Sequence, residues 1–374
     1  MKAIGIILAG GNNEKLEELT LHRAAAAMPV GGCYRVIDFA LSNMSNSGIN
    51  KVCVITQYNS RPLHSHLSSA KWWNLGRKYG GLFVFSPYLS NNNSLWFRGT
   101  ADAIYQNLSY LKLSNEPYVI IGSGNHIYKL DYQDVLDFHL DNKADMTIVS
   151  KRLDEYESKE KNLSNYGVIQ IDKNKRVIDF EEKPIEPQSD LISLGIYVIS
   201  RTLLINLLES ILADNRYNLV EDIIIRYRKK LKIMSYEFNG YWQSINSVKN
   251  YYDANMDFLD KSIRDLFMKK YPFIETKPKD EPPVKYNSNS KIKNALIGSG
   301  SIINGLIEKS IIFSKVYTGD NSVIKNSIVM DKSYVGNNCL VENAIIDKEV
   351  ILSDGKKIIG TKNKPVIIAK NSVV

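Results

Sequence analysis

Continuous apolar runs alternate with helix-like stretches over the first two thirds of the chain. Such runs cover residues 4–8, 51–55, 118–121 and 146–149. Continuous runs, in contrast to alternating ones, are typical of strands that are buried on both faces. The pattern therefore predicts an α/β domain with a mostly parallel sheet over residues 1–245.

Residues 246–293 follow a different pattern. Within this segment, residues 247–269 contain no glycine or proline, and apolar residues recur at three- and four-residue steps. This spacing predicts one helix with a single apolar face. Residues 270–293 contain four prolines among charged residues, which indicates a linker.

Residues 294–374 contain an internal repeat. Similar six-residue segments at 307–312, 324–329 and 341–346 recur 17 residues apart. In this region a valine falls at every sixth position: Val323, Val329, Val335 and Val341. One aliphatic residue per hexapeptide, followed by small or polar residues at a corner, predicts a parallel β-helix of about five three-sided coils.

Composition and charge narrow the class of protein. The chain of 374 residues has 48 Lys and Arg against 40 Asp and Glu, a formal charge of +8. Lysines are spread along the chain without an aromatic-interleaved basic tract, so we expect no nucleic-acid partner, although attraction of phosphorylated small molecules fits the charge. No apolar stretch reaches the ~18 residues of a membrane span. Three widely separated cysteines make no disulfide framework, and we expect a cytoplasmic protein.

The first predicted strand ends in a glycine turn, Gly10 and Gly11, which leads toward a helix. A turn at this place exposes backbone N–H groups that can bind phosphate. Two glycines after a strand can equally form only a tight turn. The residues alone leave both interpretations open.

Motifs of one enzyme family occur in the family's order along nearly the whole chain. They include LAGG (8–11), YRVIDFALSN (34–43), WFRGTADA (96–103), HIYK (126–129), EKP (182–184) and SLGIY (193–197). With these motifs the chain resembles the glucose-1-phosphate adenylyltransferase family, whose members join ATP to glucose 1-phosphate to form ADP-glucose and pyrophosphate for glycogen synthesis. The resemblance implies a Rossmann-like nucleotidyltransferase domain followed by a C-terminal left-handed parallel β-helix.

The resemblance also indicates which chemistry this chain lacks. In the family, the carboxylates that hold Mg²⁺ lie in a Gly-Asp-His-Ile-Tyr segment and a Trp-Arg-Asp-Val-Gly-Thr segment. Here the two positions are Asn125 and Ser244. Because Mg²⁺ prefers carboxylate and phosphate oxygens, we expect no intact catalytic site and no metal or other cofactor on this chain. Mg²⁺ is expected for a catalytic partner.

The nucleotide loop departs from the family as well. Where the family has Gly-Gly-Arg-Gly-Thr-Arg-Leu, Asn13 replaces a glycine, Glu14 adds a negative charge, and Lys15 lacks the bidentate fork of arginine. A family lysine is also lost at Ala25. What remains of the loop is Gly10, Gly11 and Lys15.

The sugar-phosphate side is closer to the family pattern. Lys183 matches the family lysine that binds the phosphate of glucose 1-phosphate, and the positions that hold its sugar are Gly167, Glu182 and Ser193. Phe97 stands where the family has a tyrosine, which removes one hydroxyl from the glucose contacts. Without the resemblance, Lys183 would be interpreted as an exposed loop lysine before a proline.

Arg23 and Arg35 match positions that contact allosteric effectors in the family. The alternative is that both form surface ion pairs, because the neighbouring family lysine is His22 in this chain.

The loss of both metal carboxylates, with the rest of the fold kept, predicts a non-catalytic or weakly active regulatory subunit of the GlgD type. We expect such a chain to assemble with a catalytic subunit into a heterotetramer. In the absence of that subunit, the chain can form a homo-oligomer. One alternative is a working adenylyltransferase whose metal is held by another acid, such as Asp131. The other is a standalone sensor that binds sugar phosphates or nucleotides at the Lys183 site.

Overall fold

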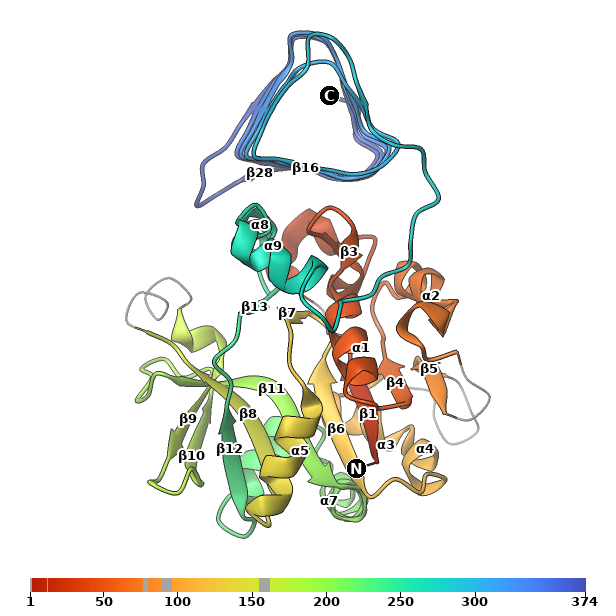
Figure 1. Ribbon diagram of the computed structural model, residues 1–374. Helices are drawn as coiled ribbons and strands as arrows, with labels where there is room; N and C mark the ends of the chain where they lie inside the picture. The colour runs from red at the N-terminus through yellow and green to blue at the C-terminus, as the bar shows by residue number, and fades with distance from the viewer. Residues whose placement is uncertain (1, 12, 77–79, 89–95, 155–161) are drawn as a thin grey trace.

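The computed structural model describes residues 2–11, 13–76, 80–88, 96–154 and 162–374. An α/β domain forms the lower part of the molecule in Figure 1, and a three-sided β-helix lies above it. The fold class predicted from the sequence is confirmed.

The centre of the α/β domain is a nine-stranded sheet. Its first half is wholly parallel, in the order β5-β4-β1-β6. These strands are β1 (Ala3–Leu8), β4 (Lys51–Ile55), β5 (Gly81–Phe85) and β6 (Tyr118–Ser123). Three of the four correspond to predicted apolar runs, so continuous hydrophobicity located the buried strands.

The second half of the sheet is mixed. β11 (Leu191–Ser200) runs antiparallel to β6 and to β8 (Met146–Arg152), and β12 (Ile233–Glu237) pairs parallel with β8. A hairpin of β9 (Gly167–Ile171) and β10 (Val177–Glu182) joins β11 through a single pair. Only β10 and β11 oppose the common strand direction.

Helices cover both faces of this sheet (Figure 1). Side chains such as Ile7 and Val54 pack against one set of helices: α1 (Ile37–Asn46), α2 (Arg61–Leu67) and α5 (Tyr132–Asp141). Side chains such as Ile6 and Ile55 pack against the other set: α3 (Thr100–Tyr105), α4 (Leu108–Lys112) and α7 (Arg201–Ala213). Apolar residues on both sides of each strand are thus accounted for by a three-layer arrangement. None of the helices in the described ranges is long and apolar enough to cross a membrane.

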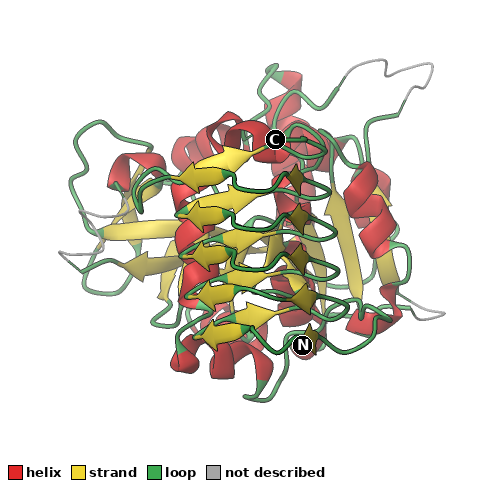
Figure 2. Cartoon of the chain, turned by 90° about the horizontal axis from the view of Figure 1, so that it is seen from above, coloured by secondary structure: helices red, strands yellow, loops and turns green. Residues whose placement is uncertain are grey.

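The C-terminal part winds into coils that each give one strand to three five-stranded parallel sheets, and Figure 2 shows the coils stacked side by side. The first sheet comprises β14 (Lys285–Tyr286), β17 (Ile302–Ile303), β20 (Tyr317–Thr318), β23 (Tyr334–Val335) and β26 (Ile351–Leu352). The second comprises β15 (Lys291–Lys293), β18 (Leu306–Glu308), β21 (Val323–Lys325), β24 (Leu340–Glu342) and β27 (Lys357–Ile359). The third comprises β16 (Leu296–Ile297), β19 (Ile311–Ile312), β22 (Ile328–Val329), β25 (Ala344–Ile346) and β28 (Val366–Ile368). Five coils agree with the number expected from the repeat.

The first coil begins at Lys285, inside the segment 246–293 that the sequence pattern assigned to a helix and linker. β14 pairs with β17, and β15 pairs with β18, in the same parallel register as the later coils. Strands of the β-helix therefore lie on both sides of residue 294.

The helix expected over residues 247–269 is corrected to two helices, α8 (Val248–Asp257) and α9 (Lys261–Met268). Asp260 causes the break, because its backbone is extended and its carboxylate accepts a hydrogen bond from the Ser262 backbone N–H. An N-cap of this kind begins a new helix.

The β-helix docks on the α/β domain through its third sheet, with α8 and α9 between the two parts (Figure 1). Outward side chains of the third sheet, among them Ile311 and Ile328, share a buried cluster with Phe39, Phe258 and Phe267. The interface is therefore a continuous hydrophobic core.

Candidate functional site

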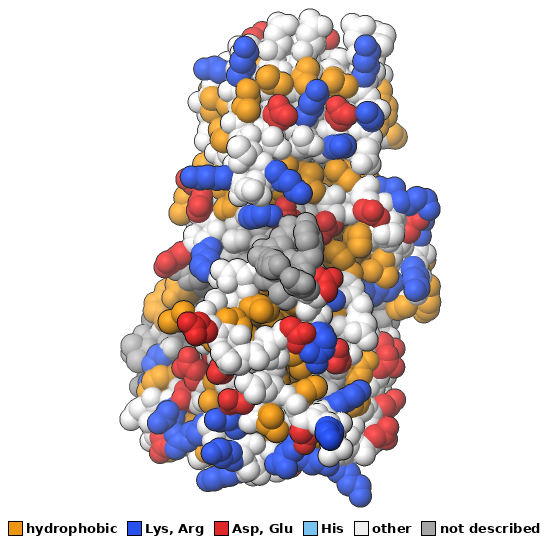
Figure 3. Space-filling view, turned by 90° about the vertical axis from the view of Figure 1, so that its left-hand side faces the viewer, with side chains coloured by type: hydrophobic (Ala, Val, Ile, Leu, Met, Phe, Trp, Pro, Cys, Tyr) orange, Lys and Arg blue, Asp and Glu red, His pale blue; other side chains and the backbone are white. Residues whose placement is uncertain are grey.

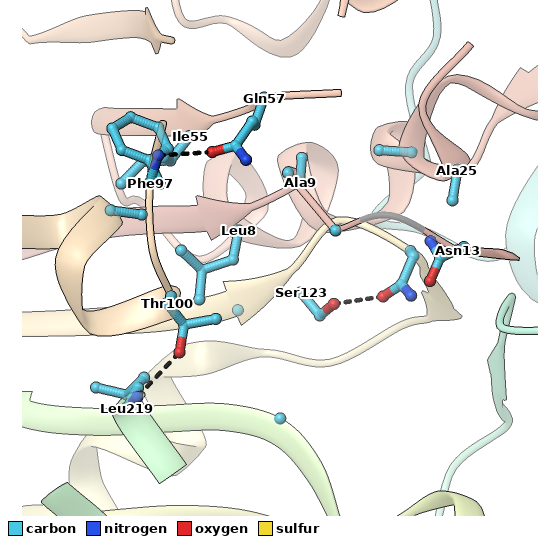
Figure 4. Close-up of a pocket in the computed structure, with 18 of the residues that line it drawn as sticks. Leu8, Ala9, Asn13, Ala25, Ile55, Gln57, Phe97, Thr100, Ser123 and Leu219 are labelled. Atoms are coloured by element: carbon cyan, nitrogen blue, oxygen red, sulfur yellow. Dashed lines mark hydrogen bonds between the residues drawn. The ribbon is translucent and has the colours of Figure 1, made fainter. Parts of the chain in front are cut away.

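A cavity of about 420 Å³ opens at the carboxyl ends of β1, β4 and β6. Its wall includes Leu8, Ile55 and Ser123, which end or closely follow these three strands (Figure 4). Ligands of open α/β sheets bind at this edge because loops and helix N-termini converge there. The cavity is therefore the candidate site of the α/β domain.

The glycine turn forms part of this wall. Gly10, Gly11 and Asn13 all line the cavity, and a 3-10 helix, η1 (Glu14–Thr20), follows the turn. Asn12 lies outside the described residues. The Lys15 ammonium donates a 2.8 Å hydrogen bond to Asn165 Oδ1, a residue distant in the sequence. Lys15 is not one of the described residues that line the cavity.

The two degenerate metal positions lie beside each other on a small antiparallel pair. Asn125 directly precedes β7 (His126–Tyr128), and Ser244 ends β13 (Trp242–Ser244) opposite His126. The Ile245 N–H donates to the Asn125 carbonyl at 2.8 Å. The two residues, distant in sequence, are therefore neighbours in the fold, although only Asn125 belongs to the described cavity wall.

The side chain of Asn125 is already engaged. The Ser123 hydroxyl donates a hydrogen bond to Asn125 Oδ1 (Figure 4). A neutral amide oxygen with one bond already made is a poor ligand for Mg²⁺, which favours carboxylates.

No Asp, Glu or Lys occurs among the described residues that line the cavity, and Arg98 is the charged side chain there. Its guanidinium pairs with Asp102 at 3.1 Å, donates to Tyr217 Oη at 2.8 Å, and lies 3.8 Å from the centre of the Tyr217 ring. The described part of the chain also holds no group of three or more His, Cys, Asp or Glu side chains that could bind a metal. The Mg²⁺ that the resemblance implies does not fit this donor set.

Phe97 lines the cavity at its other side. Its backbone N–H donates to Gln57 Oε1 at 3.0 Å, which ties the segment before α3 to the end of β4 (Figure 4). Next to it, the rings of Tyr58 and Trp96 stack with centroids 5.8 Å apart, and both side chains are exposed. Gln57 and Tyr58 received no role from the sequence, although their position after a buried strand was a usable signal.

The residues expected to hold the sugar phosphate gather on the neighbouring β9–β10 hairpin and on β11. Gly167 faces Glu182 across the hairpin, and a Cβ at Gly167 would approach Glu182 Oε2 to 3.0 Å. Burial raises the pKa of Glu182, and the Lys183 ammonium, 3.5 Å from Glu182 Oε1, opposes that rise. The Lys183 side chain is largely exposed.

Ser193 connects this group to the cavity. It is buried in β11, and its Oγ accepts a 3.3 Å hydrogen bond from the Gly195 N–H. Gly195 and Tyr197 line the cavity, and the charge of Glu182 is among the causes that raise the pKa of Tyr197, after burial. The described cavity wall itself does not include Gly167, Glu182, Lys183 or Ser193, which lie beside it.

Arg23 and Arg35 lie at the interface with the β-helix, away from this cavity. Arg23 is 4% exposed, and its Nη2 pairs with Asp347 Oδ1 at 2.7 Å. The Asp347 side chain is 1% exposed. Arg23 is therefore part of a buried ion pair between the two domains, in contrast to the surface pair considered from sequence.

Arg35 lines a second cavity, of about 210 Å³, together with Lys279, Lys348 and Asp331. Burial raises the pKa of Asp331, but Lys348 and Lys279 lower it by more, so it falls to about 2. Burial is also the main reason that the pKa values of Arg35 and Lys348 are lowered. A small cavity with an excess of cationic groups suits an anion.

Comparisons with known proteins agree with this architecture. The Nucleotidyl transferase family model matches residues 4–261, and a model described as GlmU-like, C-terminal hexapeptide, matches residues 282–365. Glucose-1-phosphate adenylyltransferase of Geobacillus stearothermophilus is 37% identical over 86% of this chain and 83% of its own length. The enzyme of that name from Clostridium acetobutylicum is 38% identical over 86% of this chain and 84% of its own length.

The corresponding protein of Bacillus mycoides is similar along almost the entire length. It is 36% identical over 97% of this chain and 96% of its own. With this coverage of both domains, the chain belongs to the glucose-1-phosphate adenylyltransferase family.

Proposed function

We propose that this chain is a non-catalytic or weakly active regulatory subunit of glucose-1-phosphate adenylyltransferase, which modulates a catalytic partner in ADP-glucose and glycogen synthesis. The observation that carries the proposal is the donor set of the main cavity. Its described wall offers no carboxylate, and the Asn125 side-chain oxygen is bound by Ser123.

The missing carboxylates matter because adenylyl transfer depends on charge neutralisation. A metal ion on the transferring group lowers the barrier by several kcal/mol, and each 1.36 kcal/mol is tenfold in rate. The loss of metal binding alone is therefore expected to slow the reaction by about 10³-fold or more. Arg98 is not a ready replacement, because Asp102 already neutralises it.

The sugar-phosphate side supports ligand binding without catalysis. Lys183 has an exposed ammonium next to Glu182. On the neighbouring strand β11, Ser193 accepts a hydrogen bond from the Gly195 N–H, and Gly195 lines the cavity. We propose that a sugar phosphate binds here, with the phosphate at Lys183. Anionic effectors are proposed to bind at Arg35, because Arg23 is occupied by Asp347.

The surface of the β-helix supports assembly with another subunit. One outward row of its first sheet is apolar and uncovered in the chain as described: Ile302, Tyr334 and Ile351 are 38%, 40% and 46% exposed. The ring of Tyr317 stacks on that of Tyr334 at 4.8 Å in the same row. By contrast, the face seen at the top of Figure 3 carries hydrophobic side chains interspersed with acidic and basic ones. We propose that the apolar row contacts the catalytic subunit in a hetero-oligomer.

The test is ADP-glucose formation by the purified chain alone and after addition of a catalytic subunit. We expect little or no product from the chain alone and a change in turnover or effector response of the mixture. Lys183→Gln should weaken the effect of glucose 1-phosphate, and Lys173→Gln, at an exposed lysine on the same hairpin, is the matched control.

Other outcomes would favour the other two functions. Turnover by the chain alone within roughly 1–100 s⁻¹ would show a working adenylyltransferase and refute the proposal. A thermal shift with glucose 1-phosphate, combined with no effect on any catalytic subunit, would instead favour a standalone sensor.

A further inference from the structure

The second sheet of the β-helix has an outer face with two different rows of side chains. In β18, β21 and β24 the central residue is buried inside the coil, so its two neighbours point outward. One outward row is aliphatic and half-buried: Leu306, Val323 and Leu340. The other is the charged row, which runs through successive coils: Lys293, Glu308, Lys325 and Glu342. Figure 3 shows this face at its top, where acidic and basic side chains alternate beside hydrophobic ones.

The described part of the chain leaves this face uncovered. The α/β domain packs against the third sheet, and the side chains of Lys293 and Lys325 are 76% and 38% exposed. A contiguous aliphatic row beside charged residues is typical of a protein–protein interface. The second sheet is therefore a candidate contact surface, separate from the first-sheet row around Tyr334.

Ion pairs within the chain satisfy only part of the charged row. Glu308 Oε1 lies 3.2 Å from Lys293 Nζ, and its Oε2 lies 3.9 Å from Lys325 Nζ. Glu342 forms no ion pair with any of the residues that the structure describes. The row thus has an unpaired carboxylate at one end and an exposed ammonium at the other.

The order of the charges indicates which partner fits this face. From the first coil to the fourth the signs are +, −, +, −, so the same row in the opposite direction is −, +, −, +. If two copies meet about a two-fold axis parallel to the strands, the coil order is reversed across the interface. Lys293 of one copy then faces Glu342 of the other, and Glu308 faces Lys325. Every contact along the row joins opposite charges.

Other alignments of the two copies are unfavourable. A shift by one coil sets Glu308 of one copy against Glu342 of the other and Lys325 against Lys325, which places like charges together. A two-fold axis along the stack of coils sets the charged row against the aliphatic one. In the self-complementary register, by contrast, Leu306 of one copy packs against Val323 of the other.

We propose that the outer face of the second sheet binds a second copy of this chain about a two-fold axis parallel to the strands. A second copy fits because it supplies the reversed order of charges at an identical spacing. The charged row fixes the register, and the aliphatic row supplies the apolar contact. This dimer is independent of the proposed function, which assigns the catalytic subunit to the first sheet.

The test measures self-association of the full-length chain by sedimentation equilibrium. We expect a dimer of the parent at micromolar concentrations. Glu308→Lys and Lys325→Glu each place like charges opposite each other at both symmetry-related contacts, so each should dimerise at least about tenfold more weakly. Both are exposed substitutions, and the unfolding temperature should stay close to that of the parent.

An equal mixture of the two variants is the decisive sample. In a mixed dimer, the 308–325 contacts again join opposite charges, so the mixture should associate with nearly the affinity of the parent. A folding defect in one chain is not repaired by the other, so this recovery requires contact between residues 308 and 325 of different copies.

Glu349→Lys is the matched control. Glu349 also lies between two lysines of the β-helix, 3.7 Å from Lys332 and 3.4 Å from Lys370, but outside the second sheet. This variant should dimerise as the parent does. A parent that stays monomeric at about 100 μM, a mixture no stronger than its two components, or an equal loss in Glu349→Lys would each overturn the inference. None of these results bears on assembly with a catalytic subunit, which Tyr334→Glu tests.

Discussion

The buried pair of Arg23 and Asp347 makes a strong prediction about how the two domains are held together. Both side chains are 5% exposed or less, and Nη2 lies 2.7 Å from Oδ1. Arg23→Met keeps most of the side-chain volume but leaves the Asp347 carboxylate inside the interface. Breaking a buried pair by removing one partner costs about 3–5 kcal/mol.

The surroundings place the expected cost near the lower end of this range. Asp347 keeps one hydrogen bond, because the Lys348 backbone N–H donates to its Oδ1 at 2.6 Å. We therefore expect Arg23→Met to lower the free energy of unfolding by about 3 kcal/mol. Arg23→Met combined with Asp347→Asn removes both charges and should recover most of this loss, because no unpaired charge is left.

Urea unfolding followed by two signals is the appropriate assay. All tryptophans, four in number, lie within residues 1–245, so fluorescence reports on the α/β domain, whereas far-UV circular dichroism also reports on the β-helix. For m-values of a few kcal/mol/M, a loss of about 3 kcal/mol shifts the midpoint by about 1 M. Because the pair joins the domains, the two signals should also separate in Arg23→Met.

The control is an ion pair of the same length at the surface. Lys112 Nζ lies 2.7 Å from Glu209 Oε1, with both side chains about half exposed. Lys112→Met should cost about 0.5 kcal/mol or less. If Arg23→Met were no more damaging than Lys112→Met, or if the double variant were as unstable as the single one, burial would not be the source of the effect.

Three further predictions concern the metal positions, acid stability and assembly. The double variant Asn125→Asp and Ser244→Asp should be stabilised against heat by Mg²⁺ or Mn²⁺, whereas the parent should not, and it should form some ADP-glucose. Stabilisation by the metal without any product would locate the remaining defect in the nucleotide loop. The pKa of Asp331 is lowered to about 2, so its carboxylate stabilises the fold above about pH 4 and loses this effect as the pH falls through 2. Asp331→Asn should therefore lower the free energy of unfolding by about 2 kcal/mol at pH 7. In urea titrations, the variant should also show a smaller decline in stability between pH 4 and pH 2 than the parent. An acid limb identical to that of the parent would contradict this assignment. Tyr334→Glu, at the exposed apolar row, should prevent co-elution with a catalytic subunit on size exclusion while leaving the circular dichroism spectrum unchanged. Deletion of residues 291–374, by comparison, would expose the core around Phe258 and could not separate assembly from folding.

The sequence pattern was most informative where burial is uniform along an element. β1, β4 and β6 are buried on both faces, so their residues are continuously apolar. The interior of the β-helix requires a buried aliphatic residue on each side of a coil, as at Val335 in β23 and Val341 in β24, which are fully buried. These constraints act locally and are therefore visible in a single chain.

The pattern was less informative at ends and junctions. In the first coil, Lys285 and residues 291–293 are exposed, and the end of a stack does not require the aliphatic spacing of its interior. The helix break at Asp260 depends on one capping hydrogen bond. A single capping residue hardly alters the spacing of apolar residues, so the break is not visible in the hydrophobic pattern. Local hydrogen bonding overrode the periodic signal in that segment.

Side-chain partners across long separations could not be predicted from spacing. Lys15 bonds to a residue 150 positions away, and Arg23 pairs with one 324 positions away. The resemblance assigned Gly10 and Gly11 to a nucleotide loop, Phe97 to the sugar-phosphate group and Asn125 to the metal positions, and the structure brings all four to one cavity wall. It did not indicate that Ser123 would occupy the Asn125 oxygen.

The two metal positions have lost their charge without disturbing the local structure. Asn125 accepts a hydrogen bond from the Ser123 hydroxyl, and Ser244 stays paired with His126 between β13 and β7. A carboxylate at either position would need a metal ion or another cation to offset its burial, whereas the neutral amide and hydroxyl do not. The cavity of about 420 Å³ beside Asn125 is kept, so the proposed ligand binding in the α/β domain and the proposed assembly through the β-helix do not depend on metal chemistry.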